Sequence, residues 1–317
     1  MTGQFAGFFD DVVRLAIWFA LLAAIFVPLE RLLAERTQGL WRREALNDLA
    51  YYFFNGLILS VLLAWPAALL GVAASHLVPD AVLHATAEMP LWLRVVAALV
   101  IGDLGAYWGH RWSHEWPLLW RFHSVHHSAK DVDWLTNTRA HPLDLVFTRF
   151  CGLMPLYATG LAQASQGAEL LPVIVALIGT VWSFVVHANL RWRLGWIEQV
   201  ISTPSFHRWH HTNDAMRDHN YAAILPVLDR AFGTFHLPRG RPTVYGIDGN
   251  MPPGFLAQLI QAFQRSPDAA LRLPKPRAPS HAVGVGRVGG YRQGDQHEGE
   301  KTPHAPSPTR TPGWKNP

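Results

Sequence analysis

Apolar residues in the first third of the chain fall into three long runs, residues 12–29, 49–70 and 91–108. A helix needs about 17 to 25 predominantly apolar residues to cross a bilayer, and each run has about that length. The first run opens with Asp10 and Asp11, lacks a basic leading region and has no small-x-small cleavage pattern after it. The pattern therefore predicts an all-α, polytopic integral-membrane helical bundle whose first helix is retained.

Two shorter apolar stretches follow at residues 145–161 and 170–187. The first contains Arg149 and Pro155, and the turn between the two stretches has no Lys or Arg. They can form two full spans or a re-entrant hairpin, since irregular backbone is tolerated at membrane depth where protein covers it. From residue 266 to residue 317 Pro, Gly and charged residues dominate, which predicts a disordered tail.

The distribution of Arg and Lys predicts the orientation of the helices. The loop after the first run carries Arg31, Arg36, Arg42 and Arg43, whereas residues 71–90 contain neither Arg nor Lys. Short loops rich in these residues stay on the cytoplasmic side. We therefore expect the N-terminus outside, and the end of the third run with the region after it on the cytoplasmic side.

Composition agrees with a membrane protein, because 50% of the residues are hydrophobic and only 16% are charged. The formal net charge of +4 does not indicate nucleic-acid binding, since the basic residues are scattered among loops. Cys151 is the single cysteine, so an intramolecular disulfide is excluded. It lies in an apolar run, and we expect it to be a small buried core residue.

Histidine is concentrated in one part of the chain, since eleven of the seventeen histidines lie between residues 110 and 219. Most are three or four residues apart, which places their rings on one helix face. Imidazole binds iron, zinc, copper or nickel, and one ion takes four to six ligands. The pattern thus predicts two metal ions. The candidate ligands are His110, His114, His123, His126, His127, His141, His187, His207, His210 and His211.

Three of the polar residues have alternative interpretations. Asp103 lies seven residues before His110 on roughly the same helix face, where it could hold an imidazole in place or pair with another polar group. His141 and His187 stand alone in the sequence, and a single histidine is often a hydrogen-bonded core residue.

Several ordered motifs resemble the integral-membrane fatty acid hydroxylase and sterol desaturase superfamily over about residues 96–237. They are HRWSH at 110–114, LWRFHSVHHS at 119–128, RAHPLD at 139–144, HAN at 187–189, TPSFHRWHH at 203–211, DHNY at 218–221 and LDRAFGTF at 228–235. The resemblance implies transmembrane helices over 1–95, a catalytic domain over 96–240 with a cytoplasmic helical cap, and an amphipathic segment over 241–265 before the tail.

The resemblance also implies a non-haem di-iron oxygenase that uses O2 and two external electrons to hydroxylate or desaturate a lipid C–H bond. Two Fe ions are the expected cofactor, with Zn as an alternative in purified protein. The family pattern places ligands at nine of the candidate histidines, and His141 matches its His-Pro-Leu-acidic motif. Asp144 and His219, with Asp103, are candidates for orienting the ligands. A cytochrome, ferredoxin or flavoprotein is the expected electron donor, because the chain has no dinucleotide, haem or ferredoxin motif.

Two other classes of protein remain open on the residues alone. A membrane zinc hydrolase also uses histidines, but it needs fewer of them, and the chain lacks the His-Glu-x-x-His signature. A metal transporter or storage protein would distribute histidines across the depth of the bilayer. Two irons that cycle with a reductant would favour the oxygenase, whereas two redox-silent zincs would favour the hydrolase.

Overall fold

The computed structural model describes residues 2–39, 42–162 and 170–264, and all regular structure in these ranges is helical. The long helices are α1 (Thr2–Leu32), α2 (Ala45–Leu77), α4 (Leu91–Glu115), α6 (Pro142–Ala158) and α7 (Leu171–His187). The predicted all-α fold is confirmed. The predicted tail at 266–317, with its histidines, lies outside the described residues, and the four-segment division of the chain stays a prediction.

Three of these helices are long and apolar enough to cross a membrane: Gly7–Leu32, Ala45–Leu77 and Leu91–Glu115. Each contains one of the three apolar runs of the sequence. Few side chains in these helices are buried by protein, as is usual where lipid covers a helix. The protein is therefore an integral membrane protein. The two shorter stretches form α6 and α7, which have 17 residues each.

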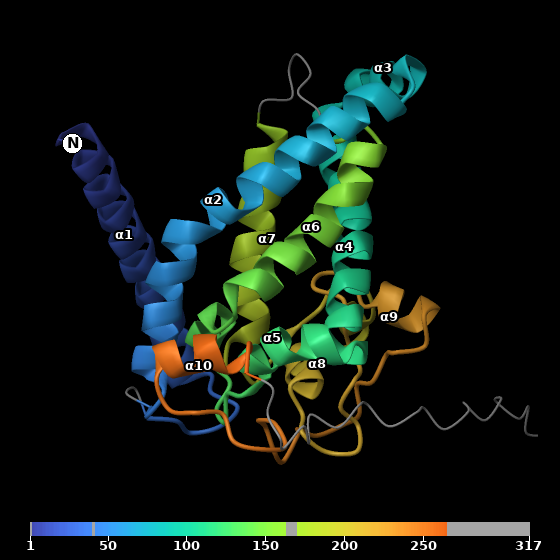
Figure 1. Cartoon of the computed structure of the whole chain (residues 1–317). Helices are drawn as coiled ribbons and strands as arrows, with labels where there is room; N and C mark the ends of the chain where they lie inside the picture. The colour runs from blue at the N-terminus through green and yellow to red at the C-terminus, as the bar shows by residue number, and fades with distance from the viewer. Residues whose placement is uncertain (1, 40–41, 163–169, 265–317) are drawn as a thin grey trace, which may run out of the picture. The chain divides into compact units, whose positions relative to one another are not determined.

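Short helices gather at the C-terminal end of α4, opposite the end that carries α3 (Asp80–Glu88) (Figure 1). They are α5 (Pro117–His127), η1 (Trp134–Thr138), η2 (Gly195–Gln199), α8 (Pro204–His210), α9 (Val227–Ala231) and α10 (Phe255–Gln261). Pro117, Pro142 and Pro204 each stand in the first turn of a helix, where the missing N–H has no cost. Two of these short helices, α5 and α8, carry half of the candidate ligands.

Helices α4 and α6 approach closely because α4 presents glycine to α6. A Cβ added at Gly105 would lie 2.2 Å from the backbone oxygen of Cys151, and one at Gly109 would lie 2.8 Å from the Cys151 Cβ. Small residues allow two membrane helices to pack backbone to backbone. Cys151 is 3% exposed, which confirms its expected place in the core. This contact brings the first turn of α6 to the histidines of α4 and α5.

A buried network of charged side chains holds η1 against the start of α2. Arg139 donates from Nε to Asp48 at 2.5 Å, and Arg42 pairs with both Asp48 and Asp133. The Asp133 side chain also caps η1 by accepting hydrogen bonds from the Leu135 and Thr136 N–H groups. Removing one partner of such a network leaves an unpaired buried charge, which is strongly destabilising. The network therefore sets the position of the backbone at residues 133–139.

Candidate metal centre

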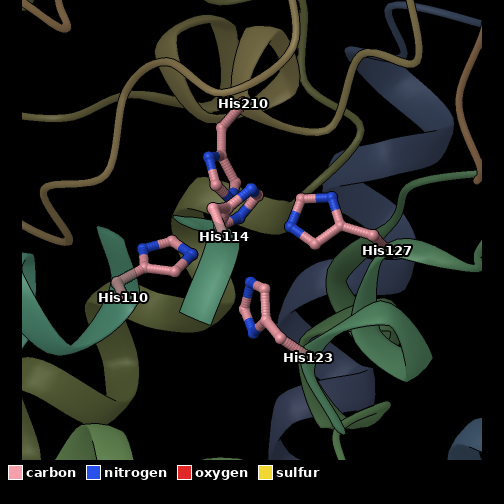
Figure 2. Close-up of side chains that lie close together, drawn as sticks. All are labelled: His110, His114, His123, His127 and His210. Carbon is pink, nitrogen blue, oxygen red and sulfur yellow. The ribbon is translucent and has the colours of Figure 1, made fainter. Parts of the chain in front are cut away.

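The structure brings nine of the ten candidate histidines into two adjacent groups. In each group the potential ligand atoms lie within 4.8 Å of one another. The first group, drawn in Figure 2, takes two rings from α4, two from α5 and one from α8, and all five converge on a common centre. It consists of His110, His114, His123, His127 and His210. The second group, from α5, α7 and α8, consists of His126, His187, His207 and His211.

The second group is held so that Nε2 atoms face each other. The Nε2 of His187 lies 3.2 Å from that of His126 and 2.9 Å from that of His207, and the Nε2 atoms of His207 and His211 are 3.1 Å apart. Ligands about 2.0–2.1 Å from one tetrahedral ion are separated by similar distances. The four nitrogens thus have the spacing of a coordination shell.

Backbone carbonyl groups fix the outer nitrogen of four of the rings. A carbonyl oxygen only accepts, so each of these Nδ1 atoms carries the hydrogen and each neutral ring has its lone pair on Nε2. The pairs and their Nδ1 to oxygen distances are His110 with Tyr221 (2.8 Å), His126 with Arg139 (2.9 Å), His187 with Ser183 (2.7 Å) and His210 with His219 (2.9 Å).

Carboxylates orient two further rings of the first group. The Nδ1 of His123 lies 2.9 Å from Oδ2 of Asp144, in the first turn of α6, and Ser113 donates to the other oxygen of that carboxylate. The Nδ1 of His114 lies 3.1 Å from Oδ1 of Asp218. Asp144 therefore has the contact that its candidate role requires. The contribution of Asp218 was not recognised in the sequence, where only its place in the DHNY motif marked it.

The protein alone does not satisfy these inward-facing nitrogens. The Nε2 atoms of His114, His123, His127 and His210 are buried without a hydrogen-bond partner. In the second group, the Nε2 atoms of His126 and His187 face each other. Each carries a lone pair, because the hydrogen of its ring is on Nδ1, so neither atom can donate to the other. A buried acceptor without a donor is costly, and a bound cation removes that cost. The donor set therefore fits metal ions.

Electrostatics at the site also favours the neutral, ligating form of imidazole. Burial, followed by the presence of neighbouring imidazoles, lowers the pKa of His126, His127, His207, His210 and His211 well below the usual value. Metal binding requires deprotonated ligands, so these rings need not release a proton at neutral pH.

The structure does not bring His141, the tenth candidate ligand, into either group. It is the N-cap residue of α6, where its Nδ1 accepts from the Leu143 N–H at 3.2 Å. Its ring packs against Phe122 and Phe263. Pro142, which follows it, is the first residue of α6.

Asp103 takes the second of its two expected roles, since its contacts are with backbone and not with imidazole. Its carboxylate accepts hydrogen bonds from the N–H groups of Ala223, Ile224 and Leu225, at distances from 2.7 to 3.2 Å. A carboxylate in a membrane helix thereby binds the loop that follows Tyr221. Because the Tyr221 carbonyl orients His110, Asp103 supports the site through this loop.

His219 contributes to the site through its backbone. Its carbonyl orients His210, while its own Nδ1 interacts with the carbonyl groups of Met216 and Arg217. The residues on either side, Asp218 and Asn220, have positive φ angles of 69° and 60°. Asp and Asn tolerate this left-handed conformation better than most residues, and it turns the His219 carbonyl toward His210.

The comparisons with known proteins agree with this geometry. The sequence profile described as Fatty acid hydroxylase matches residues 95–234. An ornithine lipid hydroxylase, OlsE of Rhizobium tropici, is 35% identical over 298 residues, which is 87% of this chain and 84% of that protein. The alkylglycerol monooxygenase of Danio rerio is 31% identical over 65% of this chain and 46% of its own length. A methylsterol monooxygenase of Arabidopsis thaliana is 29% identical over 46% of this chain and 55% of its own length. No solved structure matches.

The fold and the site define a helical membrane protein with a buried centre of nine histidines. The chain belongs to the fatty acid hydroxylase family, because both the profile and a relative similar over most of its length place it there. It is an oxidoreductase of that family, as the sequence predicted. The hydrolase and transporter alternatives are not favoured, since the relatives are named hydroxylases and monooxygenases.

Proposed function

We propose that the two histidine groups hold two iron ions and that the protein oxidises a lipid C–H bond with O2 and two electrons supplied from outside. The observation that carries the proposal is the set of buried Nε2 lone pairs that face each other without a hydrogen-bond donor. Nine neutral imidazoles are the ligand set that first-row transition metals prefer. The five-residue group would hold one ion and the four-residue group the other.

When bound, a reduced di-iron pair would supply the activation of O2, and the residues of the chain hold and surround it. The four carbonyl groups and the carboxylates of Asp144 and Asp218 hold the imidazole rings in their ligating tautomer. Burial of the rings keeps water away from the centre, which protects a reactive site from side reactions. The described residues therefore orient the ligands and shield the centre.

A lipid is the substrate that agrees best with both the position of the site and the relatives. The first histidine group begins on the last two turns of the membrane helix α4, so a substrate reaches it from the bilayer. The relatives are named for ornithine lipid, alkylglycerol and methylsterol. The product is a hydroxylated or a desaturated lipid, because both outcomes begin with removal of hydrogen from carbon.

Electrons come from another protein of the cytochrome, ferredoxin or flavoprotein class. The sequence has one cysteine and no haem or dinucleotide motif of its own. Arg and Lys are concentrated in the loops on the same side as the histidines, which supports a multi-pass topology with the site facing the cytoplasm. Reporter fusions at Gly3 and Pro317 are expected on opposite faces of the membrane. Fusions on the same face would contradict this topology.

The central experiment uses the full chain in lipid nanodiscs, loaded with Fe(II) and supplied with a reductant and ¹⁸O2. We expect two irons per chain, O2 consumption that depends on lipid, and ¹⁸O in the hydroxylated lipid. The same protein loaded with Zn(II) is the control and is expected to consume no O2. Lipid oxidation by protein that holds one iron or none, or two irons with no O2 consumption on any lipid, would refute the proposal.

A further inference from the structure

A cavity of about 360 Å³ lies between α1, the loop at residues 34–39, the start of α2 and η1. Its apolar wall includes Phe19, Ala23 and Val27, which lie on one face of α1, and Leu49 and Trp134 stand across from them. From Phe19 to Glu30 the helix rises roughly 16 Å, at 1.5 Å per residue. The cavity is therefore bordered by a strip of apolar helix that leads to a polar end, which is lined by Glu30, Arg31, Thr37, Gln38, Asp133 and Asn189.

Glu30 lies at this polar end, in the last turn of α1. Its Oε1 accepts hydrogen bonds from the N–H groups of Trp134 and Asn189, both at 2.8 Å. Its Oε2 accepts none from the described residues, and no Lys or Arg in those ranges forms an ion pair with it. The second acid in the cavity, Asp133, is already paired with Arg42. Arg31 also lines the cavity, but its guanidinium donates a hydrogen bond to the Gln38 carbonyl group. Among the described residues, Glu30 is thus the acid of the cavity that forms no ion pair.

Two backbone segments connect the Glu30 end of the cavity to the second histidine group. Asn189 follows His187 of the second histidine group by two residues, and Trp134 belongs to the η1 segment whose Arg139 carbonyl orients His126. A ligand in the cavity consequently lies against the two backbone segments that also carry parts of the second group. This position suits a substrate and not only a lipid that fills space.

We propose that this cavity binds the headgroup of a lipid that carries a primary ammonium, with the ammonium at Glu30 Oε2 and an acyl chain along the Phe19–Val27 face of α1. A buried carboxylate without an ion pair is stabilised by a cation. The adjacent apolar wall of α1 suits a hydrocarbon chain attached to that cation. The proposal names a substrate class and so rests on the proposed function. An acylated basic amino acid has the required chemistry.

The test measures binding to the full chain in detergent by calorimetry, without turnover. The probes are a short-chain N-acyl ornithine, the same molecule with its side-chain amine acetylated, and free ornithine. For the wild-type protein we expect the first probe to bind about 10- to 100-fold more tightly than the acetylated one, which lacks the charge-assisted hydrogen bond. Free ornithine is expected to bind weakly, because it has no chain to contact α1.

Two variants locate the effect at the cavity. Glu30→Gln keeps the shape of the side chain and its acceptor for the two backbone N–H groups, and we expect it to remove the preference for the amine probe. Asp11→Asn is the matched control, since Asp11 is an exposed acid on the same helix that pairs with Arg14, and it should change nothing.

The outcomes separate this proposal from the proposed function. Equal affinity of the wild-type protein for the amine and acetylated probes would overturn the ammonium site, and this comparison requires no variant. Equal affinity for free ornithine and the acylated probe would overturn the lipid assignment. A Glu30→Gln variant that weakens both acyl probes alike would show a structural role only. Failure of lipid oxidation would refute the function while leaving these binding ratios interpretable.

Discussion

The hydrogen bond between His123 and Asp144 gives the most direct test of the metal centre. Both side chains are buried, with 5% and 6% of their surface exposed, and the Nδ1 to Oδ2 distance is 2.9 Å. Replacing Asp144 with Ala leaves the Nδ1 hydrogen without an acceptor and the ring free to rotate. Replacing it with Asn keeps an acceptor for His123, while the amide N–H group can donate to the oxygen of Ser113.

The expected magnitude follows from the kind of bond removed. A hydrogen bond to a charged group contributes about 1.5–3 kcal/mol, which corresponds to about 10- to 100-fold in a binding constant. Loss of a residue that orients a metal ligand typically lowers metal affinity by a similar factor. Asp144→Ala should therefore weaken metal binding about 10- to 100-fold, and Asp144→Asn should weaken it less.

The assay is competition for metal against a chelator of known affinity, with the metal counted in the protein fraction. Glu115→Ala is the matched control, because Glu115 follows His114 directly but forms its ion pair with Arg111 on the outer side of α4. Size-exclusion chromatography in detergent checks that each variant is folded. If Asp144→Ala retained metal as well as Glu115→Ala, the proposed orientation of His123 by a carboxylate would be refuted.

Four further outcomes are expected. His210→Ala should lose turnover and lower the metal content while membrane insertion is unchanged, and normal product formation would contradict its role as a ligand. His141→Ala should retain two metals per chain and lose only about 0.5–2 kcal/mol of stability, because it removes a helix cap; loss of metal would return His141 to the ligand set. Gly105→Ala should lower the midpoint of thermal unfolding, since its Cβ would meet the Cys151 oxygen and overpacking costs about 1–3 kcal/mol; an unchanged midpoint would contradict the close contact of α4 and α6. Chelator-treated protein should have a lower free energy of unfolding at pH 5 than at pH 8. Burial lowers the pKa of histidines such as His207 and His211 in the folded protein. The unfolded chain therefore binds more protons than the folded protein as the pH falls below about 6.5, and stability decreases. Denaturant titrations that give equal stability at the two pH values would exclude this effect.

Asp103 and His141 show where sequence patterns reach their limit. The sequence left two roles open for each residue: Asp103 could hold an imidazole or pair with another polar group, and His141 could be a ligand or a hydrogen-bonded core residue. Spacing identifies the helix face on which a side chain lies, but not the segment that packs against that face. For Asp103 the neighbouring segment is the loop at residues 223–225, and for His141 it is the start of α6 with two aromatic rings. These neighbours are distant in sequence, so only the folded chain shows them.

Much of the molecule was determined by the sequence alone. The apolar runs predicted the membrane helices because helix length must match bilayer thickness, and the ordered histidine motifs identified the family. The sequence placed histidines three and four residues apart on one helix face. In the structure the pairs four apart share a group, His110 with His114, His123 with His127 and His207 with His211, whereas the pairs three apart, His123 with His126 and His207 with His210, are divided between the groups.

The tertiary structure decided how these pairs are combined. His126 and His127 are adjacent in sequence, as are His210 and His211, yet each adjacent pair is divided between the two groups. Successive residues of an α-helix point about 100° apart, so one short helix can serve two centres only if the centres lie on either side of it. That condition depends on how α5 and α8 pack beside α4 and α7. The carbonyl groups that orient the rings likewise have no signal in the sequence, since every residue carries one and only the fold selects which of them faces an imidazole.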